Sequence, residues 1–88
     1  MDQIRQWIIQ HEMTPRIALG LEFTLRAGDL HDAMHLHAQM PMVCNAMKQM
    51  PAHCQVRIVQ IVGPRGVVGI DVGPGANYFV TYVVLDAH

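Results

Sequence analysis

The last third of the chain carries apolar side chains at almost every position of its expected strands. Gly-Pro turns at 63–66 and 73–76 separate three β-rich runs, at 55–62, 66–72 and 77–86. Successive side chains of a strand point to opposite faces, and in the final run both faces are apolar. Such a strand is normally covered on both sides. This chain must therefore supply, or find, cover for two faces of a sheet.

One chain of this length has little material for the second face. The helical segment 29–50 can cover one face, whereas the short helix expected at 2–12 covers only part of the other. If four or five apolar side chains stayed in water, the lost free energy of burial would be similar to the whole unfolding free energy of a small domain, about 5–15 kcal/mol. We therefore expect a homodimer or larger assembly, whose interface residues are Tyr78, Val80, Tyr82 and Val84. The alternative is a monomer in which the first helix covers that face.

The first half of the chain changes its periodicity twice. Ile4, Trp7 and Ile8 recur at helical spacing, which predicts an amphipathic helix over 2–12 that ends before Pro15. Residues 16–26 alternate between large apolar side chains and polar or small ones, which predicts a strand with one side in water.

Residues 29–50 predict helix, with Asp29 as the N-cap. Pro41 lacks an N–H and interrupts the segment, so we expect helices at about 29–39 and 41–50. The predicted fold is α+β, in the order α-β-α-β-β-β with the second helix broken at Pro41. A four-stranded, mostly antiparallel sheet carries the helix on one face. The 88 residues form a single domain, 1–88.

Composition excludes several classes of protein. Only 15% of the residues are charged and 51% are hydrophobic, which excludes a disordered or low-complexity chain. No apolar run approaches the roughly 18 residues of a membrane span. No basic region precedes an apolar stretch at the N-terminus, so we expect no signal peptide and a cytoplasmic protein. Cys44 and Cys54 are then free thiols rather than a disulfide framework.

A cluster of histidines and cysteines raises the alternative of a metal-binding protein. His31 and His35 are four residues apart and share one helical face, as two metal ligands must. His53 and Cys54 follow the helical segment and could fold back to complete a site for zinc, copper or nickel. The spacing lacks the paired cysteines of a structural zinc site. Alternatively, both helical histidines lie on the solvent face, and no cofactor is bound.

A weaker alternative is nucleic-acid binding through Arg57 and through Arg65 at the tip of the first hairpin. Six basic residues against seven acidic ones, with a net charge of −1, argue against this role. The chain contains no serine and its carboxylates are scattered, so we expect no enzyme activity. The leading hypothesis is a small non-enzymatic binding module that contacts another protein through an apolar sheet face or edge.

Overall fold

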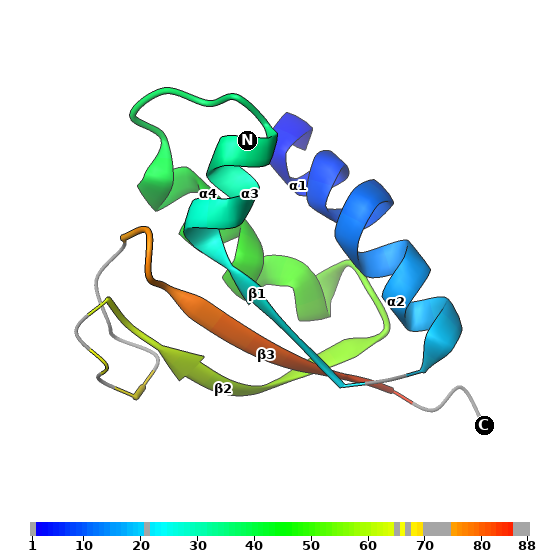
Figure 1. Ribbon diagram of the computed structural model, residues 1–88. Helices are drawn as coiled ribbons and strands as arrows, with labels where there is room; N and C mark the ends of the chain where they lie inside the picture. Colours follow the sequence, from blue (N-terminus) through cyan, green and yellow to red (C-terminus); the bar gives the residue numbers. More distant parts are fainter. Residues whose placement is uncertain (1, 21, 65, 67, 70–74, 86–88) are drawn as a thin grey trace.

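The computed structural model describes residues 2–20, 22–64, 66, 68–69 and 75–85. Within them the chain is α+β, with helices packed on one side of an antiparallel sheet (Figure 1). The elements, in chain order, are α1 (Asp2–Ile8), the π-helical turn η1 (Ile9–Met13), α2 (Thr14–Leu19), β1 (Phe23–Arg26), α3 (Ala27–Ala33), α4 (Met40–Gln49), the 3₁₀ turn η2 (Met50–Ala52), β2 (Val56–Val62) and β3 (Phe79–Val84).

The sheet has three strands in the described residues, in the order β1-β3-β2, and both pairings are antiparallel. The last strand is therefore central: Val80 pairs with Leu25 on one side and with Ile61 on the other. The predicted fourth strand, 66–72, is not confirmed. Its described part contributes one isolated bridge, between Val62 and Val68, and residues 67 and 70–72 lie outside the described residues.

The first helical region runs past the predicted end, through Pro15 to Leu19. In a regular α-helix the proline ring would clash with the carbonyl four residues earlier. Here the preceding turn is wider, because the Thr14 N–H donates to the carbonyl of Ile9, five residues back. Pro15 then stands in the first turn of α2, where its missing N–H costs little.

The predicted strand 16–26 is therefore wrong in its first half. Residues up to Leu19 are helical, and the helix ends where Gly20 adopts a left-handed conformation with φ 70°. Its N–H donates to the carbonyls of Arg16 and Ile17, at 3.0 and 3.1 Å. A few alternating residues fit either structure, and here the helix continues because its preceding turns are already formed.

The predicted interruption of the second helical region is present, but Pro41 lies after the break. α3 ends at Ala33, and Pro41 belongs to the first turn of α4. The connecting segment contains two residues with positive φ, His35 (55°) and Ala38 (54°). The predicted N-cap is also wrong, because Arg26 occupies that position and Asp29 pairs with its guanidinium at 2.8 Å.

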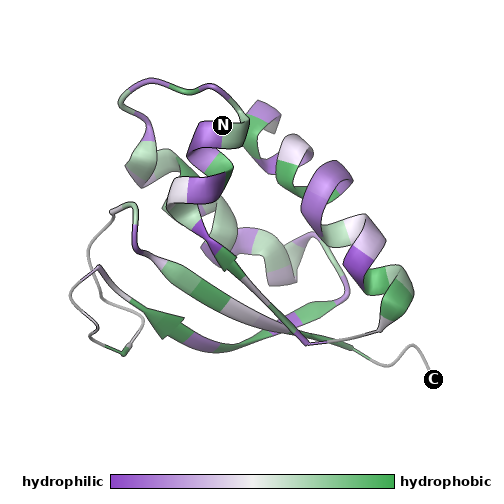
Figure 2. Cartoon of the chain, viewed as in Figure 1, coloured by the Kyte–Doolittle hydropathy of each residue, from purple (hydrophilic) through white to green (hydrophobic). Residues whose placement is uncertain are grey.

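The core lies between the helices and one face of the sheet, where the buried side chains form a single cluster. Figure 2 shows hydrophobic residues along β2 and β3 and mixed hydrophobic and hydrophilic positions on the helices. The largest side chains that are fully buried in this cluster are Tyr78, Tyr82, Ile8, Met13, Met47, Met50, Val43, Val56 and Val80.

An aromatic contact ties the N-terminal helices to the sheet. The Arg16 guanidinium, which pairs with Glu12, lies 5.4 Å from the centre of the Phe23 ring. That ring in turn packs against Tyr82, with centroids 5.3 Å apart. Arg16 therefore links α2 to β1 and, through Phe23, to the central strand.

A buried hydrogen bond ties β3 to α4. The Tyr82 hydroxyl donates to the carbonyl of Met47 at 2.6 Å. In a continuing helix that carbonyl would accept from residue 51, but Pro51 has no N–H. The Met50 N–H and the tyrosine hydroxyl take its place. The hydroxyl of Tyr78, by contrast, is buried and forms no hydrogen bond with the described residues.

These two tyrosines make a matched pair for testing the packing. We expect Tyr82→Phe to lower the free energy of unfolding by about 1 kcal/mol, because a buried hydrogen bond is lost. Tyr78→Phe should leave it unchanged or raise it slightly, because the removed hydroxyl has no partner. Urea unfolding followed by circular dichroism measures both changes. A larger loss for Tyr78→Phe than for Tyr82→Phe would contradict this arrangement.

Candidate functional site

The face of the sheet opposite the helices is the main surface that no described helix covers (Figure 1). Successive side chains of a strand point to opposite faces of the sheet, so the side chains on this surface are those whose sequence neighbours point into the core. We call this surface the open face and define it by Thr24 on β1, Phe79, Thr81 and Val83 on β3, and Arg57, Gln60 and Val62 on β2.

The middle of the open face is polar. Thr24 and Thr81 pair across β1 and β3, and their hydroxyl oxygens are 2.8 Å apart. Gln60 stands on the other side of Thr81 and is exposed. The half-buried Phe79 and Val83 flank this row along β3. The open face thus combines hydrogen-bonding groups with apolar side chains.

A shallow groove of about 570 Å³ crosses the open face. Its polar wall includes Glu22, Gln60 and Thr81, and its apolar wall includes Val59 and Val68. Val59 is 45% exposed and Val68 61% exposed, although both are large hydrophobic residues. Val59 stands in a β-bulge, where the register between β2 and β3 shifts by one residue. Two of the four large hydrophobic residues that are exposed in the described part of the chain therefore line this groove.

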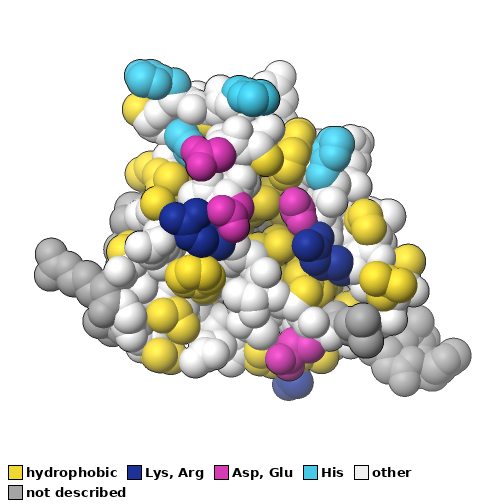
Figure 3. Space-filling model, viewed as in Figure 1, with side chains coloured by type: hydrophobic (Ala, Val, Ile, Leu, Met, Phe, Trp, Pro, Cys, Tyr) yellow, Lys and Arg dark blue, Asp and Glu magenta, His cyan; other side chains and the backbone are white. Residues whose placement is uncertain are grey.

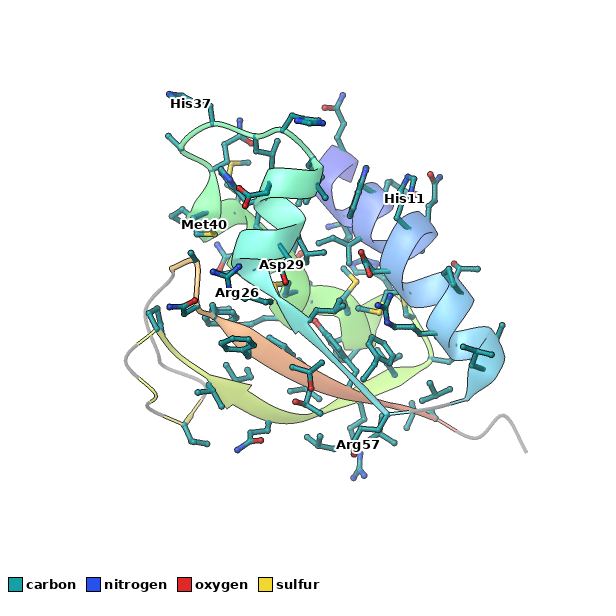
Figure 4. All side chains as sticks on the ribbon, viewed as in Figure 1. His11, Arg26, Asp29, His37, Met40 and Arg57 are labelled. Carbon is teal, nitrogen blue, oxygen red and sulfur yellow. The ribbon has the colours of Figure 1, made fainter. Side chains whose placement is uncertain are left out.

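Two charged groups border the same end of the open face. Arg57 pairs with Val83 and points away from the helices (Figure 4). Glu22 immediately precedes β1, and its side chain is exposed. Neither forms an ion pair or a side-chain hydrogen bond with another described residue. At the opposite end Arg26 is engaged, because it donates to Asp29 and to Asn77.

The two edges of the sheet are less available than the open face for contact with another chain. Along the outer edge of β2, the Gly69 N–H donates to the carbonyl of Ile61 at 3.0 Å, and Val68 bridges Val62. The bulge at Val59 bends the remainder of that edge. β1 has only four residues. The face therefore offers a larger regular surface than either edge.

The structure places the predicted interface residues on the wrong side of β3 for contact with a partner. Tyr78, Val80 and Tyr82 are fully buried in the core beneath helices of the same chain. Val84 lies on the same side and is half-buried at the end of the strand. The correction has a physical reason: both faces of β3 are apolar in sequence, and the helices cover the face that carries the two tyrosines.

The predicted metal ligands do not converge. His31 already accepts a hydrogen bond at Nε2 from the backbone N–H of Gln39, at 3.3 Å. His35 lies in the loop after α3, whereas His53 and Cys54 follow η2. In the described part of the chain, no three His, Cys, Asp or Glu side chains form a group that could hold a metal ion. Histidines lie on η1, on α3 and on the loop that follows α3 (Figure 3), but as separate side chains.

The predicted nucleic-acid residues divide in the same way. Arg57 is exposed on the open face, and Arg65 lies outside the described residues. By strand pairing Arg26 also lies on this side of the sheet, level with Phe79, but its guanidinium is engaged with Asp29 and Asn77. No described helix has both the length and the apolar character needed to cross a membrane.

Apart from Arg57, which was predicted for a different role, sequence reasoning missed the residues of the open face. A usable signal was the polar set Thr24, Arg57, Gln60 and Thr81, which the strand pairing brings together. Their alternation with buried residues indicates a face toward water. That these residues share one face can be recognised only once the register of the strands is known.

Comparison with known proteins yields no relative: no protein-family model, curated sequence or solved structure matches this chain.

The thiols also have a testable chemistry. Burial raises the pKa of Cys44, and burial likewise raises the pKa of the half-buried Cys54. A raised pKa lowers the thiolate fraction at a given pH, and the thiolate is the nucleophile. At pH 8 we expect iodoacetamide to modify the folded chain at least about 10-fold more slowly than the urea-unfolded chain, with Cys54 reacting before Cys44.

Mass spectrometry of timed samples measures the two rates. Equal rates for Cys44 in the folded and unfolded chain would contradict the burial of that thiol. The folded rate should still rise between pH 8 and pH 9, because the raised pKa values keep both groups mostly protonated at pH 8.

Proposed function

We propose that this chain is a non-catalytic protein-binding module that docks on another polypeptide with the open face of its sheet. The observation that carries the proposal is the one-sided covering of the sheet. All described helices lie on the side of Tyr78, Val80 and Tyr82, while Phe79, Thr81 and Val83 face the other way (Figure 1).

The chemistry of the open face favours a protein partner. Interfaces between proteins that also exist apart combine an apolar centre with hydrogen-bonding groups, and are about as apolar as ordinary surface. The open face has this composition, with valines and a phenylalanine around a row of two threonines and a glutamine. Burying Val59 and Val68 further would add stabilisation of the order of 1 kcal/mol each.

The competing functions have less support. A nucleic-acid site would need several free cations on one surface; this side of the sheet carries Arg57, and Arg26 is already paired with Asp29, in a chain whose net charge is −1. A metal site would need converging ligands, which the described histidines and cysteines do not supply. Nucleophilic catalysis by either cysteine is disfavoured because burial raises both thiol pKa values.

Two lysine substitutions test the proposal. Val59→Lys places a charge in the groove of the open face, whereas Leu19→Lys makes the same change at a 69% exposed leucine at the end of α2. We expect Val59→Lys to weaken association at least about 10-fold, because docking would have to desolvate the ammonium group. Leu19→Lys should leave association unchanged.

Sedimentation velocity measures association of the chain with itself. Quantitative cross-linking with mass spectrometry measures its capture of other polypeptides in a lysate of the source cells. Both variants should keep the unfolding free energy within about 0.5 kcal/mol of the parent chain, because both sites are exposed. Equal association by the parent chain and the Val59→Lys variant in both assays would end the proposal.

A further inference from the structure

The two charged groups at one end of the open face occupy opposite sides of the central strand. Arg57 on β2 is level with Val83 of β3. Phe23 of β1 pairs with Tyr82, so Glu22, one residue earlier, reaches the level of the same valine from the other side. Across the strands, this end of the open face therefore carries a negative group (Glu22), an apolar one (Val83) and a positive one (Arg57).

We propose that the open face binds a second copy of this chain, around a two-fold axis parallel to β3; the inference rests on the proposed function and names its partner. A half-turn about that axis exchanges the two sides of the sheet, so β1 of one copy faces β2 of the other. Glu22 of each copy then faces Arg57 of the second copy. Both ion pairs form at once, as an isologous interface requires.

The same rotation aligns the residues of β3 with their own copies, and it places Arg26, whose charge is paired with Asp29, at the level of Val62 of the second copy. Val83 meets Val83 of the second copy, and the same holds for Thr81 and for Phe79. The apolar side chains thus bury one another at the two ends, and hydroxyl groups meet in the middle. Sheets stacked face to face lie about 10 Å apart with nearly aligned strands, a spacing that long side chains such as glutamate and arginine can bridge.

The other two-fold arrangement is less favourable. An axis running across the strands would bring Glu22 opposite Arg26 of the second copy, but Arg26 already holds Asp29 and Asn77. It would also place Arg57 over Val62, because Phe79 pairs with both Arg26 and Val62 at that end. The charge of Arg57, which forms no ion pair with another described residue, would then be desolvated against an apolar side chain.

The size of the open face sets the strength of the dimer. Three strands spaced about 4.8 Å apart and roughly 20 Å long present a small surface, at the low end of specific interfaces. We expect a reversible dimer with a Kd on the order of micromolar rather than an obligate one. Association should weaken with added salt, because the two ion pairs lie at the rim of the interface.

Charge reversal tests the pairing directly. Arg57→Glu and Glu22→Arg each replace both intermolecular attractions by repulsions, and we expect each single variant to dimerise at least about 10-fold more weakly than the parent chain. Mixing the two variants should restore a dimer, because one copy then carries two negative groups and the other two positive groups. The double variant should also dimerise like the parent chain. Sedimentation velocity from 5 to 500 µM measures all of these.

Matched controls place the same charge changes on the helical side. Lys48→Glu on α4 and Asp32→Arg on α3 change the net charge equally but lie away from the open face. They should leave the dimer unchanged. Urea unfolding of every variant establishes that it is folded, and recovery of the dimer on mixing excludes loss of structure as the cause of weakening.

The outcomes separate this inference from the proposed function. A parent chain that stays monomeric at 500 µM, or single variants that do not recover on mixing, would overturn the inference of a second copy. The proposed function survives that result if Val59→Lys still abolishes capture of another polypeptide. A dimer that is indifferent both to charge reversal and to Val59→Lys would overturn both.

Discussion

The hydrogen bond from Tyr82 to the carbonyl of Met47 joins the two layers of the molecule at its centre. Tyr82 lies on the strand that holds both edge strands, and Met47 lies near the end of α4. The carbonyl needs this donor because Pro51 cannot supply the helical one. Burial of Tyr82 excludes water from the bond and also raises the pKa of the phenol, so the hydroxyl stays protonated and donates.

From this link follows the one-sided architecture. The hydrogen bond holds α4 over the face that carries the tyrosines. α1 packs beside α4 on the same face of the sheet (Figure 1). The opposite face keeps its threonines, glutamine and arginine in water. A sheet with one wet face is ordinary for antiparallel strands. Here, however, Phe79, Val83 and Val62 share that face with the polar groups, and this mixture is the basis of the proposed docking surface.

The buried hydroxyl of Tyr78 forms no hydrogen bond with the described residues, which leaves one polar group of the core unsatisfied. Burial, together with the nearby thiol of Cys44, raises the pKa of Tyr78 to about 12. Cys44 itself is buried against the carbonyl of Gly75. A buried polar group without a partner costs free energy, so packing in this region is sustained by the surrounding apolar contacts.

The sequence by itself determined the class of fold, the two long strands near 55–62 and 77–86, and the interruption between two helices before residue 41. These depend on local features: alternation, turn chemistry and the preference of proline for the first turn of a helix. It did not determine that residues 16–19 are helical, because a π turn absorbs Pro15. Nor did it determine which face of β3 is core, since both faces are apolar along the chain. Only the tertiary structure decided that, by placing Tyr82 where a helix carbonyl lacks a donor, and thereby leaving the threonine side uncovered by the described helices.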